Sequence, residues 1–244
     1  MHSQEQIRGH IGTTLFNLHL GRIKDFQGLL ETFLQTRALR SLMTTNESVL
    51  QGLVEVLIDE PDRRITELRL VVDGTREKGD GRYGFVDLFL FPKGSTTGER
   101  TPGIALELKD ITLSGLMKGS VGDWHYLPEY SEFQELSNAL SNESEDDLLD
   151  RNYMYWSKKA SACVMTTVGA IVGDAVKQLE NYLTVIALGK PRSYNDSGVL
   201  NDLVRIVQGY DHLVGHVIVA IGGRRVFTRS VKPVQTKYEY RKCL

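Results

Sequence analysis

Three strand-like segments follow one another in the first half of the chain, and they constrain the fold more than any other feature. They are ITELRLVV (65–72), GFVDLFLF (84–91) and GIALELKD (103–110), all rich in branched and aromatic residues. Such short runs bounded by turn signals are typical of β-strands. Glycine-containing loops separate the three segments, so each strand can reverse into the next. The pattern predicts a three-stranded meander.

Helical patterns lie on both sides of these strands. Residues 4–42 carry apolar side chains at helical spacing, with a break near Gly21, which predicts two or three helices. Residues 47–58 predict one further helix, and residues 167–188 predict a long helix that stops at Gly189. The order of helices, strands, helix and strands predicts an α/β fold with a central mixed β-sheet flanked by helices.

Two segments near the carboxyl terminus predict further strands. The segment HVIVAIGGRRVFTRSV (216–231) predicts a hairpin with a two-residue turn at Gly222-Gly223. Residues 202–211 predict a short strand followed by a turn. Both strands would join the central sheet.

The chain divides into two parts by pattern. Residues 1–45 predict a helical N-terminal extension, and residues 46–244 predict the main domain. Within the main domain, residues 112–160 give no clear pattern and resemble an insertion.

Composition restricts the class of protein. The chain has 244 residues, of which 41% are hydrophobic and 25% charged, and no apolar run approaches 20 residues. These values are typical of a soluble protein that has no membrane partner. Cys163 and Cys243 are the only two thiols, which suggests neither a disulfide framework nor a zinc site. We therefore expect an intracellular location, cytoplasmic or nuclear. The formal net charge of -2 argues neither for nor against nucleic acid, because opposed patches can cancel.

Charged residues interrupt two of the predicted strands. Residues two apart on a strand face the same side, so Glu107 and Lys109 point together with Ala105. Asp87 lies in an apolar segment, where an unpaired, dry carboxylate costs several kcal/mol. If the two strands pair, Asp87 and Glu107 can meet, with Lys109 beside them. A structural ion-pair network is one reading of this group.

The other reading is a metal site. Two carboxylates together with water suit a hard cation such as Mg²⁺ or Mn²⁺. A metal there would neutralise charge on a phosphate and lower the pKa of a bound water, and an ammonium group would orient that water or stabilise developing charge. The grouping therefore favours phosphodiester hydrolysis.

Further polar residues are candidates for the same site. Gln178 and Tyr182 are four residues apart on the predicted long helix, so they share one of its faces. Glu47 lies in the first turn of its helix, where it either stabilises the helix dipole or adds a carboxylate to the site. Arg224 and Arg225 follow the predicted glycine turn and would either contact phosphates or be solvated there.

The order of these motifs resembles a known family. An acidic helix residue, an Asp on one strand, E-x-K on the next and a helix with Q-x-x-x-Y resemble the PD-(D/E)XK nuclease superfamily, and the Gln/Tyr element resembles its RecB-like branch. Over about residues 46–231, the chain is similar to uncharacterised nuclease-like domains of fungi and protists, which occur near mobile elements or in Crinkler-type effectors. The segments that carry this resemblance are NESVLQGLVEVLI, GDGRYGF, IALELK, QLENYL and VIVAIGGRRV.

The resemblance implies a restriction-endonuclease-like core and a role for each matching residue. Asp87 and Glu107 would bind the metal, and Lys109 would be the catalytic lysine. Glu47 would be the helix carboxylate, and Gln178 with Tyr182 would lie near the substrate.

The function implied is that of a metal-dependent deoxyribonuclease, acting as an endonuclease or an exonuclease with Mg²⁺ or Mn²⁺. DNA is favoured over RNA as the substrate. The alternative is a catalytically inactive nucleic-acid-binding or protein-interaction module on the same scaffold. Delivery into a host cell as an effector stays open beside an intracellular role.

Overall fold

The computed structural model describes residues 4–35, 47–94, 100–119, 125, 128–157, 160–222 and 224–243. Its strands are β1 (Arg64–Val71), β2 (Tyr83–Leu90), β3 (Gly103–Ile111), β4 (Asn152–Ser157), β5 (Ala162–Thr167), β6 (Gly198–Val199), β7 (Val204–Ile221) and β8 (Arg225–Lys242). Its α-helices are α1 (Gln4–His19), α2 (Lys24–Leu34), α4 (Glu47–Ile58), α5 (Leu113–Met117), α6 (Tyr130–Asn142), α7 (Glu145–Asp150) and α8 (Val168–Ala187), and Pro61–Arg63 form one 3₁₀ turn.

A six-stranded mixed sheet in the order β6-β1-β2-β3-β7-β8 forms the centre of the fold. Strands β1, β2 and β3 pair antiparallel in succession, which confirms the predicted meander. Strand β3 then pairs parallel with β7, and β7 pairs antiparallel with β8. The prediction of a central mixed sheet flanked by helices is confirmed.

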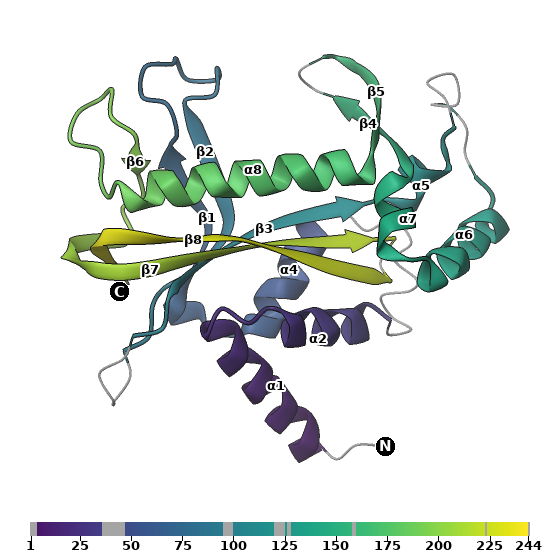
Figure 1. Cartoon of the computed structure of the whole chain (residues 1–244), viewed down its shortest axis with the longest axis horizontal. Helices are drawn as coiled ribbons and strands as arrows, with labels where there is room; N and C mark the ends of the chain where they lie inside the picture. The colour runs from purple at the N-terminus through teal and green to yellow at the C-terminus, as the bar shows by residue number, and fades with distance from the viewer. Residues whose placement is uncertain are drawn as a thin grey trace.

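Helices cover both faces of this sheet (Figure 1). Helix α8 lies along one face, and α1, α2 and α4 lie on the other. Alternate residues of β3 serve the two faces, since Ala105 joins the core beneath α8 whereas Ile104 and Leu106 join the core beneath the amino-terminal helices. The alternation arises because successive strand side chains point to opposite sides.

Helix α8 is the element that brings a second layer to the predicted site. The hydroxyl of Thr167 caps its amino terminus by accepting a hydrogen bond from the backbone N–H of Ala170 at 3.1 Å. The helix packs closely on β7 at Gly215, where a Cβ would lie 3.0 Å from a methyl carbon of Leu179. The predicted helix over 167–188 is confirmed, as is the helix over 47–58.

The predicted hairpin over 216–231 is confirmed, but two predictions about turns near the carboxyl terminus were wrong. Residues 202–211 are not a short strand and turn, because β7 continues from Val204 to Ile221 and absorbs the glycine there as a shift in register between Gln208 and Asp211. The hairpin turn has three residues rather than two, because Ile221 pairs with Arg225. Gly222 has a φ of 57° and packs against Leu113, where a Cβ would lie 2.4 Å from a methyl carbon.

The segment that resembled an insertion contains regular structure. Within residues 112–160 lie α5, α6, α7 and β4. Strand β4 pairs antiparallel with β5 in a separate two-stranded sheet, and this hairpin was not predicted from the sequence. In Figure 1 the hairpin rises from the amino-terminal end of α8, on the side away from the central sheet. In the part of the chain that the structure describes, no helix is long and apolar enough to cross a membrane.

Candidate functional site

Asp87 lies on β2 where its pairing with β3 stops. The ladder between these strands runs from Leu90 opposite Ile104 to Leu88 opposite Leu106. Beyond it, the carboxylate of Asp87 accepts a hydrogen bond of 2.6 Å from the backbone N–H of Leu108 through Oδ2. The side chain therefore bridges the two strands where the backbone ladder ends.

The sheet is irregular at this position. On β2, Gly84 faces α8, and so does Phe89, five residues later. In a regular strand, residues an odd number apart point to opposite faces, so the alternation of side chains is interrupted between these two residues, where Asp87 lies. On the neighbouring strand β1, Glu67 lies in the register row of Asp87 and has a φ of 54°, in the left-handed region. Non-glycine residues in that region are uncommon and cluster at functional sites.

Glu107 is the most buried carboxylate of the site, with 1% of its side chain exposed. Its Oε1 accepts hydrogen bonds from Nζ of Lys109 at 2.8 Å and from Nε2 of Gln178 at 2.9 Å. Its Oε2 is buried and has no hydrogen-bond partner among the residues that the structure describes. Burial and, to a smaller extent, the charge of Asp87 raise the pKa of Glu107 to about 7, against the attraction of Lys109.

Lys109 lies between two carboxylates. Its Nζ is 2.8 Å from Oε1 of Glu107 and 3.8 Å from Oε2 of Glu47, whose side chain is half-exposed in the first turn of α4. Burial lowers the pKa of Lys109, but the charges of Glu107 and Glu47 outweigh burial and raise it overall. The ammonium group is therefore charged at neutral pH.

Gln178 and Tyr182 reach the site from α8. Nε2 of Gln178 donates to Oε1 of Glu107 and also to the hydroxyl of Tyr182, at 2.9 Å and 3.1 Å. The ring of Tyr182 packs on Gly84, where a Cβ would lie 2.6 Å from Cε1 of the ring. Burial, followed by the charge of Glu107, raises the pKa of Tyr182, so its hydroxyl remains neutral.

Negative charge predominates in this group. Burial is the main cause of the raised pKa of Asp87, and the hydrogen bond from Leu108 and the charge of Lys109 oppose it. The charges of Glu47 and Glu67 raise it further. The carboxylates of these residues thus outnumber the single ammonium group. Six of the residues that the sequence suggested form one connected group, which is called the carboxylate site below. They are Asp87, Glu107, Lys109, Glu47, Gln178 and Tyr182.

The two arginines at the β7–β8 turn are placed elsewhere. Arg224 donates to the side-chain oxygen of Asn138 on α6 at 2.8 Å. Arg225 donates to the backbone carbonyls of Leu140 at 3.0 Å and Glu143 at 2.9 Å, near the end of α6. These contacts hold α6 to the hairpin, so the structure does not bring the arginines into the carboxylate site.

A cleft of about 300 Å³ adjoins the carboxylate site. Lys109 and Gln178 belong to both, and the cleft is also lined by Tyr153 and Tyr155 of β4. Sequence reasoning missed this wall, although the closely spaced aromatic residues of NYMYWS (152–157) were a visible signal. It also missed Glu67, because only the sheet register places that residue beside Asp87.

The metal-binding capacity of the site depends on few side chains. Among the described residues, no group of three or more His, Cys, Asp and Glu residues is arranged to hold a metal ion. Mg²⁺, however, is usually bound through one or two carboxylates plus substrate phosphate, and it retains several waters. The carboxylates of Asp87 and Glu107 fit this mode of binding, and Oε2 of Glu107 is the oxygen without a partner in the described part of the chain.

Comparison of the chain with models of protein families, with curated proteins and with solved structures gives no match in any of the three.

Proposed function

We propose that this protein is a metal-dependent deoxyribonuclease of the PD-(D/E)XK type, with a restriction-endonuclease-like core over residues 46–244 that hydrolyses phosphodiester bonds. One observation carries the proposal. Glu107 is buried between β3 and α8, with Oε1 held by Lys109 and Gln178 and Oε2 without a partner in the described part of the chain. A buried carboxylate oxygen with no partner is costly, so its presence is best explained by a ligand.

Asp87 and Glu107 would hold Mg²⁺ or Mn²⁺. When bound, the ion would supply charge neutralisation at the scissile phosphate and acidify a water for attack. The hydrogen bond from Leu108 fixes Asp87 at 2.6 Å, and Gln178 fixes Glu107 at 2.9 Å. Both carboxylates are thus oriented by neighbouring groups.

Lys109 would act on the substrate side. Its ammonium group is charged because Glu107 and Glu47 stabilise the cation. It can hold the attacking water or stabilise the negative charge that develops on the phosphate. Tyr182 positions Gln178 through a 3.1 Å hydrogen bond, and Gln178 in turn holds Glu107. Tyr182 would therefore affect catalysis through Gln178 and Glu107.

A second function, a non-catalytic nucleic-acid-binding or protein-interaction module, has one observation in its favour. Lys109 already forms ion pairs with Glu107 and Glu47, which compensates part of the negative charge without any metal. Such a module would bind its partner without requiring a divalent ion.

A cleavage assay separates the two functions. Supercoiled plasmid, linear duplex, single-stranded DNA and RNA are each incubated with the protein and Mg²⁺, Mn²⁺ or EDTA. We expect DNA cleavage that needs the divalent ion, is absent in Asp87→Asn, and persists in Glu180→Gln, which removes an exposed carboxylate of α8. Cleavage of no substrate with either ion would leave the binding module as the better account, and cleavage of RNA alone would replace the substrate class.

A further inference from the structure

The cleft beside the carboxylate site has an aromatic wall. Tyr153 and Tyr155 are two residues apart on β4, so their side chains lie on the same side of the hairpin. Their rings are stacked, with centroids 6.2 Å apart and an interplanar angle of 14°. This geometry lies within the range of favourable aromatic pairs.

The inner ring of the pair is held in place by the α5 segment. Tyr153 is 8% exposed, and its hydroxyl lies 3.4 Å from the hydroxyl of Thr112. Its ring packs on Gly115, where a Cβ would lie 2.3 Å from Cε2. Tyr155, stacked on this fixed ring, is 38% exposed and lines the cleft. The cleft therefore presents a pre-oriented and accessible aromatic ring.

The charged residues on the other walls of the cleft indicate whether it suits a phosphate or a nucleobase. Asp110 and Asp174 line the cleft together with Lys109 and Gln178. Two carboxylates repel a phosphate, but they accept hydrogen bonds from the amino groups of nucleobases. At about 300 Å³ the cleft is at the lower end of the range for small-molecule sites, which suits one flat ring system rather than a longer segment.

We propose that this cleft binds one unpaired nucleobase of the DNA strand whose phosphate lies at the carboxylate site, with the base stacked on Tyr155. The inference rests on the proposed function for the path of the strand, because Lys109 and Gln178 line both the site and the cleft. Its consequence is a preference for single-stranded or frayed DNA over closed duplex, since a base inside a duplex cannot enter the cleft.

Equilibrium binding in EDTA tests the base site separately from catalysis. The ligands are a short labelled single strand, the duplex of the same sequence and a strand of the same length made of abasic sites, all at one salt concentration. We expect Tyr155→Ala to weaken binding of the single strand about tenfold, the size of effect that base stacking on an aromatic residue gives. Tyr155→Phe should retain the affinity because it keeps the aromatic ring.

An exposed tyrosine far from the cleft provides the control for this experiment. Tyr210→Ala removes a tyrosine that is 84% exposed on β7, and it should bind all three ligands as the wild type does. The wild type should bind the abasic strand about as weakly as Tyr155→Ala binds the intact one. Equal weakening of all three ligands in Tyr155→Ala, or a change below twofold for the single strand, would overturn the base site.

The two proposals fail in distinguishable ways. If the wild type cleaves no substrate, and Tyr155→Ala alone among the variants loses affinity for the single strand, the results would support the base site and contradict the nuclease. Cleavage that depends on Asp87, together with unchanged binding in Tyr155→Ala, would support the nuclease and remove the base site.

Discussion

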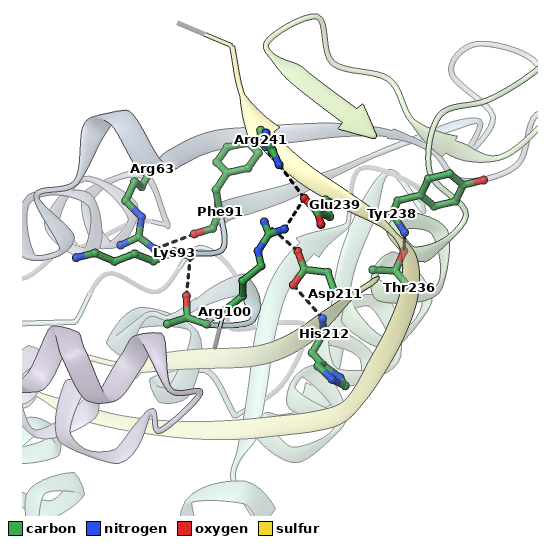
Figure 2. Close-up of polar contacts among 11 residues, drawn as sticks. Arg63, Phe91, Lys93, Arg100, Asp211, His212, Thr236, Tyr238, Glu239 and Arg241 are labelled. Carbon is green, nitrogen blue, oxygen red and sulfur yellow. Dashed lines mark hydrogen bonds and ion pairs between the residues drawn. The ribbon is translucent and has the colours of Figure 1, made fainter. Parts of the chain in front are cut away.

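Two of the charged clusters in the described part of the chain differ in the balance of their charges. The first is the carboxylate site, and the second is an arginine cluster formed by Arg100, Asp211, Glu239 and Arg241. Figure 2 shows Arg100 directed toward both Asp211 and Glu239, with Arg241 also contacting Glu239. Nη2 of Arg100 lies 3.8 Å from Oδ2 of Asp211, and the Arg241 guanidinium lies 3.0 Å from Oε2 of Glu239. Two guanidinium groups thus face two carboxylates.

The carboxylate site has no such balance. Glu107, Asp87 and Glu47 face one ammonium group, that of Lys109. The pKa of Glu107 is accordingly raised to about 7 by burial and by Asp87. In the arginine cluster, hydrogen bonds from Arg100 and Arg241 lower the pKa of Glu239, whereas burial, opposed by the charge of Arg100, raises the pKa of Asp211. In a balanced cluster the opposite charges compensate one another, whereas an excess of buried negative charge requires a proton or a cation.

Removal of one site carboxylate should give the largest effect. Glu107→Gln keeps the size of the side chain but removes the negative charge that would bind the metal. We expect DNA cleavage to fall by at least about 10³-fold, equivalent to about 4 kcal/mol of transition-state stabilisation. Melting temperature should remain equal to or above that of the wild type, since the substitution removes a buried like charge. A variant that cleaves at the wild-type rate would place Glu107 outside the catalytic machinery.

Removal of Arg100, the central residue of the arginine cluster, should lower the stability of the fold, in contrast to Glu107→Gln. Arg100→Met leaves Asp211, whose side chain is 3% exposed, without its ion pair. We expect the free energy of unfolding to fall by about 3 kcal/mol, the lower end of the range for a broken buried pair. Urea denaturation measures this loss, with Arg241→Met as the control because the Arg241 side chain is 62% exposed. Equal, small losses in both variants would show that the arginine cluster is not a stabilising unit.

The pH dependence of stability sharpens the contrast further. The pKa of Glu107 is raised from 4.5 to about 7 on folding. Because the folded state binds this proton more tightly, the stabilisation is fully present below pH 4.5 and is lost as pH rises to about 7. The expected loss is about 1–3 kcal/mol in metal-free protein.

A comparison with Glu107→Gln isolates that contribution. His216 acts in the opposite direction, since burial lowers its pKa to about 4 and stability from this group is lost on acidification. Both proteins contain His216, so the difference between their unfolding free energies at each pH reports Glu107 together with the groups coupled to it, chiefly Asp87. A difference that does not change between pH 4.5 and 8 would mean that Glu107 is not destabilised as an anion.

The smallest effect is expected on the α8 side of the site. Tyr182→Phe removes the hydroxyl that accepts a hydrogen bond from Gln178 at 3.1 Å. Because the hydroxyl positions Gln178 without contacting Glu107 itself, cleavage should fall less than tenfold, or about 1 kcal/mol. Fluorescence anisotropy should show unchanged DNA affinity, as it should for the exposed control Tyr210→Phe. A loss of affinity that equals the loss of rate would assign Tyr182 to substrate binding instead.

The sequence was sufficient for the elements whose periodicity is regular. Helix α4 and helix α8 were predicted within one residue at each end because their apolar stripes and stop signals are clear. The pairing of β2 with β3 follows from the succession of strand-like segments separated by glycine-containing loops. The common side of Glu107 and Lys109 follows from a period of two.

Other features depend on contacts between distant segments. The phase change at Asp87 and the left-handed φ of Glu67 arise where the β2–β3 ladder ends, and no local pattern encodes them. The contacts of Arg225 could not be predicted because the carbonyls that it binds, on Leu140 and Glu143, come from a segment more than 80 residues earlier. The full length of β7 was missed because a glycine within a strand looks like a turn.

Titration of metal-free protein with Mn²⁺ by calorimetry tests the central claim most directly. The wild type should bind one ion through Asp87 and Glu107, and binding should disappear in Asp87→Asn and in Glu107→Gln. Asp211→Asn, which alters the arginine cluster, should bind Mn²⁺ as the wild type does. Binding heat that survives in both site variants, or that is absent from the wild type, would contradict the assignment of the carboxylate site as a metal site.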